Sequence, residues 1–385
     1  MSFVFWVLLG TNSSYAVSVF RVNSEAILFN KTPGGNIETY RNAIQSALDQ
    51  CNAFPKNKIW DLGDRKATRK EWCNETHEQM IELAAQSNDF SELWEKSKNE
   101  FDWYQSIGDN GQGSVHYTGY YLPRLKAKRI PDTEFRYPIY SRPKELTQAT
   151  IGGKLKWGYY NSEGVFGPYF SRYEVDWLGA LQGRSLEIAY TNDFIKLFFV
   201  HIQGSGAVEI VNDAGETTES IFVNYDSQNG HTYVPIGRIL KDEGVDSSQI
   251  SMQGIVKFFE ENPFEINRLI PLNPSFIFFR EQKDGPFGAI AVKLTDEHSV
   301  AIDRTHYPLG SLALISTEIA EIKDGQVTGF QPWTRFVMSQ DVGGAILGAG
   351  RVDIYFGHDD EAELTAGIQS HRGTMYFPVI RKKQN

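Results

Sequence analysis

The sequence predicts a mainly β protein with a helical segment near its N-terminus. From Ser114 onward the chain consists of short apolar segments rich in Val, Ile, Phe and Tyr, separated by turn residues. Such segments are typical of strands, and many short strands punctuated by Gly and Pro favour barrels over a doubly wound sheet. Before that point, residues 37–107 carry apolar side chains at helical spacing, with charged residues on the other face.

Individual elements follow from these patterns. The helical segment ends where residues 109–113 read Asp-Asn-Gly-Gln-Gly, which breaks any periodic element. One further helix is expected at residues 250–259, where apolar residues form one face and Pro263 limits its extension. The expected strands are residues 115–122, 186–202, 207–211, 222–225, 276–279, 289–292, 312–315 and 335–338.

Composition narrows the class of protein. The 385 residues are enough for two domains, each with its own core. The net charge of −10 argues against a nucleic-acid-binding surface. Aromatic residues make up 13% of the chain, which suits the stacking of sugar rings, although a β-rich core uses aromatic residues as well.

The N-terminus and the cysteines bear on the compartment. Residues 1–16 resemble the apolar run and small-residue cleavage zone of a secretory signal peptide, without its basic start; a buried first strand is the alternative. No Cys follows this run, and no later run approaches the roughly 20 apolar residues of a membrane span. Cys51 and Cys73 would form one disulfide in an exported protein and stay reduced in the cytosol. Their pattern does not indicate a zinc site.

Two glycine-containing motifs do not match common catalytic loops. Residues 343–350, Gly-Gly-Ala-Ile-Leu-Gly-Ala-Gly, lack the Lys-Ser/Thr ending of a phosphate loop, and we expect them to form a tight loop close to a ligand. Gln203-Gly204-Ser205-Gly206 is not a nucleophile elbow, because Gln203 stands where that motif has Gly.

Carboxylates remain as the chemical groups of interest. Asp341 and Asp353 flank the glycine-rich loop, twelve residues apart, and Asp303 lies upstream. Asp353 sits inside an apparent strand, Arg-Val-Asp-Ile-Tyr-Phe, where Asp is disfavoured and therefore needs a reason. A carboxylic acid held on a rigid strand is the proton donor that cleavage of a glycosidic bond requires. The sequence therefore predicts an enzyme that cleaves a sugar polymer.

Several segments, taken in order, resemble the membrane-bound lytic murein transglycosylase A family over roughly residues 115–375. The last part also resembles the three-aspartate module of that family, with Asp303, Asp341 and Asp353 in its three places. The matching segments are Tyr117-Thr118-Gly119-Tyr120-Tyr121-Leu122-Pro123, Tyr137-Pro138-Ile139-Tyr140, Gln203-Gly204-Ser205-Gly206, Asn229-Gly230-His231, Ile236-Gly237, Ser251-Met252-Gln253, Asn273-Pro274-Ser275-Phe276, Ala301-Ile302-Asp303-Arg304 and residues 341–357.

The resemblance implies a fold. Residues 21–122 and 281–385 would form a discontinuous catalytic domain, a double-psi β-barrel. Residues 123–280 would form an inserted, smaller β-barrel domain. A groove between the two domains would bind a glycan strand.

The resemblance also implies chemistry. Enzymes of this family cleave the β-1,4 bond between N-acetylmuramic acid and N-acetylglucosamine without water and leave a 1,6-anhydro ring. Asp353 would be the single acid and base, with a pKa raised by partial burial, and Asp341 would support it. The residues expected to contact substrate are Thr118, Tyr120, Gln203, Ser205, Asp303 and Tyr355. For Asp303 a purely structural role is the alternative.

Peptidoglycan glycan strands are the expected partner, with other cell-wall enzymes as further candidates. We expect no metal, no organic cofactor, no nucleic acid and a monomeric protein. The chain would be exported to the periplasm or outer membrane of a Gram-negative bacterium, and a lipid anchor is not expected because the attachment Cys is missing. Two other functions stay open: a glycoside hydrolase on the same barrel, with Asp341 activating water, and a non-catalytic glycan-binding protein.

Overall fold

The computed structural model describes residues 17–382 except 28, 30, 32, 52, 53, 55, 247–249 and 251. The segment that resembles a signal peptide, residues 1–16, lies outside the described residues. The described chain forms two compact units. The first unit contains described residues of Met1–Tyr120, Phe287–Gly357 and Ile368–Asn385, and the second contains those of Tyr121–Pro286 and His358–Gly367. No helix among the described residues is both long and apolar enough to span a membrane.

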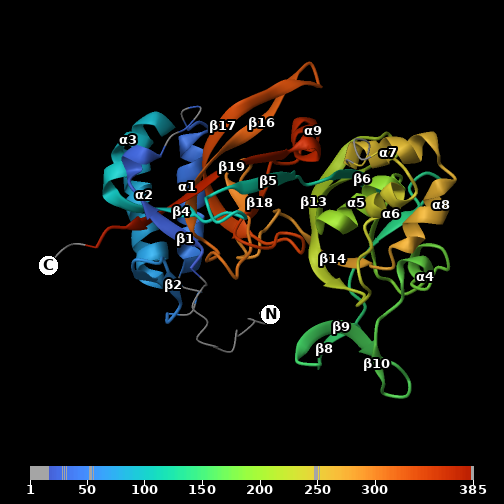
Figure 1. The fold of residues 1–385 in the computed structure, drawn as a ribbon. Coiled ribbons are helices and arrows are strands. Elements are labelled where there is room, and N and C mark those ends of the chain that lie inside the picture. The colour runs from blue at the N-terminus through green and yellow to red at the C-terminus, as the bar shows by residue number, and fades with distance from the viewer. Residues whose placement is uncertain are drawn as a thin grey trace. The chain divides into compact units, whose positions relative to one another are not determined.

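A closed barrel of six strands forms the centre of the first unit (Figure 1). Its strands, in spatial order, are β19 (Ser370–Ile380), β16 (Leu312–Lys323), β17 (Gln326–Asp341), β15 (Ser299–Ala301), β18 (Arg351–Tyr355) and β5 (Val115–Tyr120). The barrel closes because β19 pairs with β16 through one part of its length and with β5 through another. Two more strands extend this sheet from β19, namely β4 (Phe101–Ser106) and β1 (Val19–Val22).

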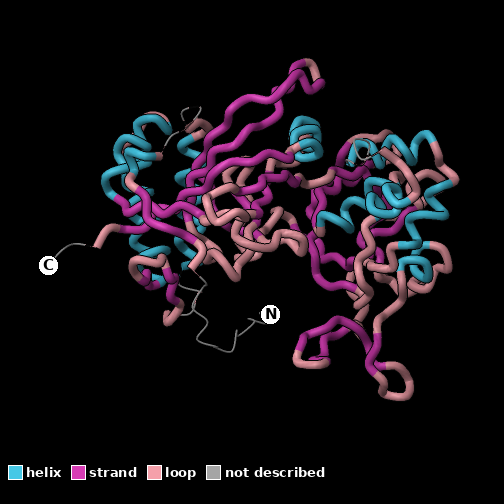
Figure 2. Tube along the Cα trace, viewed as in Figure 1, coloured by secondary structure: helices cyan, strands magenta, loops and turns pink. Residues whose placement is uncertain are grey.

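Helices from the N-terminal part of the chain cover one side of this sheet (Figure 2). The helices are α1 (Ile37–Cys51), the short π-helix η2 (Lys70–Glu75), α2 (Thr76–Ala85) and α3 (Phe90–Glu100), with a 3-10 turn η1 (Ser24–Ala26) and a small hairpin of β2 (Ile59–Asp61) and β3 (Lys66–Thr68). The apolar faces of α1 and α3 pack on Leu314 and Phe336 of the barrel. Burial of these faces, rather than helix propensity alone, stabilises such short helices.

The predicted helical segment, residues 37–107, is wrong at two places. The hairpin at 59–68 interrupts it, and it ends at Glu100 instead of 107. Residues 101–106, Phe-Asp-Trp-Tyr-Gln-Ser, form β4, which pairs with β19 on one edge and β1 on the other. Trp103 and Tyr104 point to opposite faces of this strand and both are buried, so aromatic residues suited to strands outweigh the helical spacing.

A disulfide joins Cys51, the last residue of α1, to Cys73 in η2. The sequence left this pairing open. His77 lies beside it, and these three residues form a group close enough to hold a metal ion. Because both sulfurs are bonded to each other, they are not free to act as thiolate ligands.

The second unit is built around another six-stranded sheet. Its order is β14 (Ile277–Gln282), β13 (Thr217–Gln228), β12 (Ser205–Val211), β6 (Arg124–Lys128), β11 (Glu187–Thr191) and β7 (Tyr137–Tyr140). A bridge between Ser141, next to β7, and Phe279 of β14 brings the two edge strands together, which completes a barrel. The interior is filled by aliphatic residues such as Leu125, Ile139 and Val208.

Short helices and a separate small sheet complete the second unit (Figure 1). The helices are α4 (Arg172–Asp176), α5 (Phe194–Gln203), α6 (Ile236–Asp242), α7 (Met252–Glu261), α8 (Glu265–Leu269) and the 3-10 turn η4 (Ile270–Leu272), and α9 (Asp360–Ile368) follows β18. The small sheet consists of β8 (Thr147–Ile151), β9 (Lys154–Tyr160) and β10 (Phe166–Gly167). The helix expected at 250–259 corresponds to α7.

One predicted strand is wrong in part and another in full. In the predicted strand 186–202, residues 187–191 do form a strand, β11. Residues 194–202 belong to helix α5, because Asp193 caps its N-terminus by accepting a hydrogen bond from Lys196 N–H, and Gly204 ends it with φ +80°. The apolar run Phe198-Phe199-Val200 is therefore buried as a helix. Residues 289–292 form a turn, in which Gly288 N–H donates to Val292 O and Ala291 has φ +57°.

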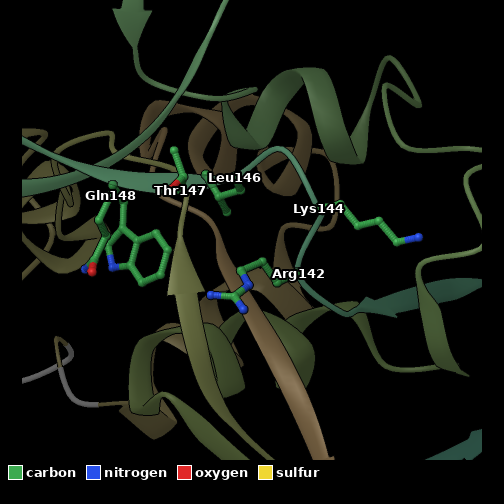
Figure 3. Close-up of a pocket in the computed structure, with 6 residues that line it drawn as sticks. Arg142, Lys144, Leu146, Thr147 and Gln148 are labelled. Atoms are coloured by element: carbon green, nitrogen blue, oxygen red, sulfur yellow. The ribbon is translucent and has the colours of Figure 1, made fainter. Parts of the chain in front are cut away.

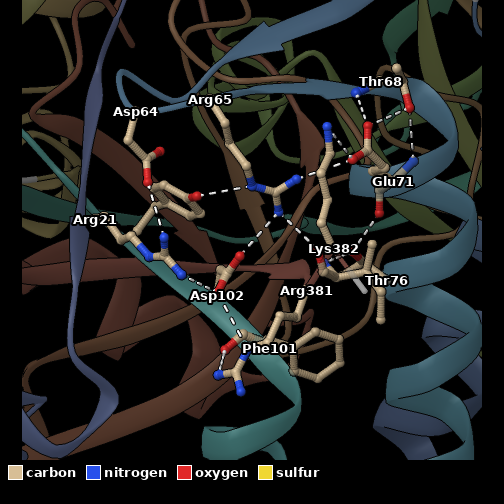
Figure 4. Close-up of polar contacts among 12 residues, drawn as sticks. Arg21, Asp64, Arg65, Thr68, Glu71, Thr76, Phe101, Asp102, Arg381 and Lys382 are labelled. Atoms are coloured by element: carbon tan, nitrogen blue, oxygen red, sulfur yellow. Dashed lines mark hydrogen bonds and ion pairs between the residues drawn. The ribbon is translucent and has the colours of Figure 1, made fainter. Parts of the chain in front are cut away.

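A cluster of charges connects β4 to β1, near the start of the described chain, and to the residues that follow β19, near its end (Figure 4). The carboxylate of Asp102, 6% exposed, pairs with Arg21 at 2.5 Å, Arg381 at 3.4 Å and Arg65 at 3.5 Å. Arg65 also donates to Tyr104 Oη at 3.1 Å and Ile380 O at 2.8 Å. Three cations around one buried carboxylate make removal of its charge costly.

We expect Asp102→Asn to lower the free energy of unfolding by about 2 kcal/mol, because buried hydrogen bonds to a charged group are lost. Asp64→Asn removes one exposed pair with Arg21 and should cost less than about 1 kcal/mol. Urea unfolding of both variants beside the wild type measures the difference. Equal midpoints for the two variants would show that Asp102 does not hold this region together.

Candidate functional site

Asp353 lies on the central part of β18, between β15 and β5. Its partner in register on β5 is Thr118, and Thr118 Oγ1 donates a hydrogen bond of 2.5 Å to Asp353 Oδ1. Its partner on β15 is Ala301. Strands on both sides fix the backbone of Asp353, so the carboxyl group has a rigid support.

Asp341, at the end of β17, accepts three hydrogen bonds. Tyr120 Oη donates to its Oδ2 at 2.9 Å. The backbone N–H groups of Val342 and Ala289 donate to its Oδ1, at 2.9 Å and 3.2 Å. The Ala289 donor belongs to the turn at 289–292, so the turn found in place of the predicted strand holds this carboxylate.

Pairing across β15 brings the two aspartates together. Ala301 has Asp341 as its neighbour on one side and Asp353 on the other. Two strand spacings put their Cα atoms roughly 10 Å apart. A bulge at Gln340, whose side chain is buried, lies just before Asp341, and bulges of this kind re-aim side chains next to functional sites.

Burial dominates the ionisation of both carboxyl groups. It raises the pKa of Asp341 to about 6, against the three hydrogen bonds that favour the charged form, and the charge of Asp353 raises it further. Burial also raises the pKa of Asp353, as expected, while the Thr118 hydrogen bond and the charge of Arg351 oppose this rise. Both groups therefore hold a proton more readily than an exposed aspartate.

Of the two tyrosines expected to contact substrate, Tyr120 lies beside Asp341 and Tyr355 lies beside Tyr120. The Tyr120 hydroxyl is engaged by that carboxylate, and its ring packs against Tyr355 with centroids 5.2 Å apart. Tyr355 is 1% exposed. In this position the Tyr355 ring supports the ring of Tyr120, and its predicted contact with substrate stays a prediction.

Asp303 shapes the glycine-rich loop. Its Oδ2 accepts a hydrogen bond from Gly348 N–H at 2.8 Å, and its Oδ1 accepts from the N–H and hydroxyl of Thr305. Burial alone would raise the pKa of Asp303, but these hydrogen bonds outweigh it and the pKa lies below its usual value. These contacts favour the structural alternative for Asp303, because its oxygens hold backbone.

Gln203 and Ser205 lie in the second unit. Gln203 ends α5 and Ser205 begins β12, on either side of Gly204. Each is partly exposed. Their predicted contact with substrate stays a prediction.

The second unit also has a cavity of about 510 Å³ that the sequence did not indicate (Figure 3). Arg142 lies over the ring of Trp157, 5.8 Å from its centroid, and pairs with Asp226 at 3.0 Å. The cavity is lined by Arg142, Lys144, Leu146, Thr147, Gln148 and Trp157.

Comparison with known proteins identifies the family. The MltA specific insert domain model matches residues 116–280, and the 3D domain model matches residues 298–378. Membrane-bound lytic murein transglycosylase A of Escherichia coli K12 is 35% identical over 278 residues, which are 71% of this chain and 68% of that protein. The chain belongs to the membrane-bound lytic murein transglycosylase A family. The protein of the same name from Vibrio cholerae is 30% identical over 303 residues, covering 78% of this chain and 74% of that one.

Solved structures of the family share the fold. A membrane-bound lytic murein transglycosylase from Agrobacterium tumefaciens matches with a TM-score of 0.73 and 27% identity, over 94% of this chain and 98% of that one. Escherichia coli MltA with bound chitohexaose matches with a TM-score of 0.72 and 26% identity, over 96% and 97%. The predicted fold class, a double-psi β-barrel with an inserted barrel, is confirmed, and so is the enzyme class, lytic transglycosylase.

We expect Tyr120→Phe to raise the pKa of Asp341 by roughly 1. The Tyr120 hydroxyl stabilises the ionised carboxylate by donating a hydrogen bond to it, and the substitution removes this bond. Carboxyl ¹³C NMR titration of aspartate-labelled protein measures this pKa. Tyr117→Phe, on the same strand, is the matched control, since its hydroxyl donates to Thr374 O instead. An unchanged or lowered pKa in Tyr120→Phe would show that the hydroxyl does not stabilise the charge of Asp341.

Proposed function

We propose that this chain cleaves the β-1,4 bond between N-acetylmuramic acid and N-acetylglucosamine in peptidoglycan and leaves a 1,6-anhydro ring on the muramic acid. The observation that carries this proposal is the single carboxyl group of Asp353, held on a barrel strand by Thr118 with a raised pKa. Membership of the lytic murein transglycosylase A family supports it.

In the first step Asp353 acts as the general acid. The Thr118 hydroxyl donates to Oδ1, which leaves Oδ2 as the oxygen that carries the proton. That proton passes to the glycosidic oxygen as the bond from this oxygen to C1 of the muramic acid breaks. The N-acetylglucosamine side leaves as an alcohol, and positive charge develops at C1 and the ring oxygen.

In the second step the carboxylate of Asp353 acts as the general base. It accepts the proton of the C6 hydroxyl of the same muramic acid, and the C6 oxygen forms its bond to C1. Asp353 is protonated again, and no water enters the products. The nucleophile belongs to the bound sugar, so the reaction gains the advantage of an intramolecular attack, and one acid is sufficient.

Asp341 supports both steps through its charge. With a pKa of about 6 and three hydrogen-bond donors, it is mostly ionised at neutral pH. A nearby negative charge keeps Asp353 protonated before the reaction and stabilises the positive charge at C1 during it.

The hydrolase alternative requires Asp341 to accept a proton from water. Both of its oxygens already accept hydrogen bonds from the protein, from Tyr120 and Val342 among others. Membership of the lytic murein transglycosylase A family makes transglycosylation the better supported reaction.

Four further residues are proposed to bind the substrate. Thr118, Tyr120, Gln203 and Ser205 would contact the glycan strand, and the family member solved with chitohexaose supports a sugar-binding site.

Export to the periplasm or outer membrane of a Gram-negative bacterium is supported by the Cys51–Cys73 disulfide, because disulfides persist in oxidising compartments. It is also supported by the membrane-bound relatives.

Mass spectrometry of digested peptidoglycan tests the reaction. We expect 1,6-anhydro products from the wild type and about a 10³-fold lower rate from Asp353→Asn, which keeps the shape of the side chain and removes the acid. Asp324→Asn is the matched control, since Asp324 lies in an exposed turn at φ +50°, where Asn is well tolerated.

Other products would point to the alternatives. Reducing ends in place of anhydro ends would show a hydrolase and make Asp341 the next residue to substitute. No products from the wild type, together with retained binding of glycan strands, would leave a glycan-binding protein.

A further inference from the structure

Three basic side chains form a row across adjacent strands of the barrel. Arg351 of β18 pairs in register with His116 of β5, and His116 pairs in register with Arg372 of β19. Residues paired across neighbouring strands project to the same face of a sheet. We call these three residues the basic row.

The basic row lies on the same face as the proposed catalytic acid. Two residues further along the three strands, the neighbours in register are Asp353, Thr118 and Ser370. Residues two apart on a strand share a face and are separated by roughly 6.6 Å. Tyr117 and Val352, which lie between the two rows, are fully buried on the opposite face.

Protein groups satisfy the basic row only in part. Arg372 Nη1 donates to Asp109 at 2.7 Å and to Ser114 Oγ at 2.8 Å. His116 Nε2 lies 3.0 Å from Ser370 Oγ. Arg351 Nη1 is buried, and no acceptor for it exists within the described part of the chain. A buried guanidinium N–H without an acceptor is costly, which favours an anionic ligand at this place.

The lowered pKa of His116 agrees with an excess of positive charge around the basic row. Burial lowers the pKa of His116, and the charges of Arg351 and Arg372 lower it further, with His371 adding to this effect and Asp109 opposing it. Among the described carboxylates, Asp109 is the one paired with the row by a salt bridge. One salt-bridged carboxylate does not balance two arginines, and Asp353, the carboxyl group that Arg351 also influences, has its pKa raised by burial.

We propose that the basic row binds a carboxylate carried by the substituent on the muramic acid sugar next to the bond that is cleaved. This inference rests on the proposed function. Arginine suits the task because its planar guanidinium donates two parallel hydrogen bonds to one carboxylate. Two sources present such a group: the free lactyl carboxylate of a naked strand, and the carboxylates of a stem peptide.

Such a site has a consequence for selectivity. A polymer made only of N-acetylglucosamine has no carboxylate, so it gains nothing from Arg351 and leaves Nη1 without an acceptor. The row would therefore select strands that contain muramic acid and place that sugar beside Asp353. Since the charge of Arg351 lowers the pKa of Asp353, a bound carboxylate that neutralises Arg351 would also help Asp353 to keep its proton.

Binding measurements separate this role from catalysis. Titration calorimetry in the Asp353→Asn background gives dissociation constants without turnover. The probes are naked strands with free lactyl carboxylates, the same strands with these carboxylates amidated, peptide-bearing strands, and chitohexaose. Arg351→Gln and Arg372→Gln remove one charge each, and Lys323→Gln, an exposed lysine at the end of β16, is the matched control.

We expect Arg351→Gln to weaken the binding of free-carboxylate strands about tenfold or more, and that of chitohexaose and amidated strands less than twofold. If Arg351→Gln folds poorly, Arg372→Gln provides the test instead, because the side chain of Arg372 is 61% exposed. Arg372→Gln should show the same selectivity. Lys323→Gln should change nothing. A loss confined to peptide-bearing strands assigns the site to the stem peptide, and a loss confined to naked strands assigns it to the lactyl group.

An equal loss for all four probes, or no loss for any, would overturn the inference. In the Asp353→Asn background with the basic row intact, ¹⁵N NMR titration of His116 gives a second measurement, because a bound carboxylate should raise the pKa of its imidazole while chitohexaose should not. The anhydro-product assay remains independent: anhydro products without charge selectivity would refute the basic row alone, whereas no products would refute the proposed reaction.

Discussion

The pairing register of the first barrel is the constraint on which the site depends. Ala301 of the three-residue strand β15 lies between Asp341 and Asp353, and β5 on the far side of β18 supplies Thr118. A shift of one residue in any of these pairings would turn every side chain of that strand to the other face. Asp353 would then point into the barrel interior, where Val352 and Ile354 are fully buried.

This register is held because the barrel closes on a single strand. β19 pairs with β5 through residues 370–373, with β16 through residues 374–376, and with β4 through residues 376–380. Its far end is attached to the hairpin of β2 and β3 through Arg65, which donates to Ile380 O. Asp102 and its three arginines thus stabilise a region remote from Asp353, yet they anchor the strand that closes the barrel around it.

The family resemblance rested on ordered motifs, and it implied both barrels. The strand pattern, a local signal, favoured barrels in general. Strands such as 207–211 and 312–315 lie where their runs of Val, Ile and Leu place them. The prediction failed where an apolar run was compatible with two structures: Phe198-Phe199-Val200 is helical, and the capping residues Asp193 and Gly204 were the available signal. The turn at 289–292 had no comparable signal, since Ala291 adopts a positive φ that alanine rarely takes.

Within the site, Asp353 could be proposed as the acid from the sequence, but its surroundings could not be predicted. Asp353 was conspicuous as a carboxylate in a strand, whereas its contact with Thr118 joins residues 235 positions apart. The same holds for Arg351 and His116, which become neighbours only through the pairing of β18 with β5.

In the proposed reaction one carboxyl group serves as acid and then as base, and the influences on Asp353 suit both roles. Burial favours its protonated form, while Thr118 and Arg351 favour the ionised form. Burial is the larger influence, so Asp353 holds its proton more readily than an exposed aspartate, and Thr118 and Arg351 stabilise the carboxylate that remains once the proton has left. An isolated buried aspartate would hold its proton too firmly to donate it, and an aspartate paired with arginine would lose it before substrate arrives. The burial of Asp353 beside Thr118 and Arg351 avoids both limits.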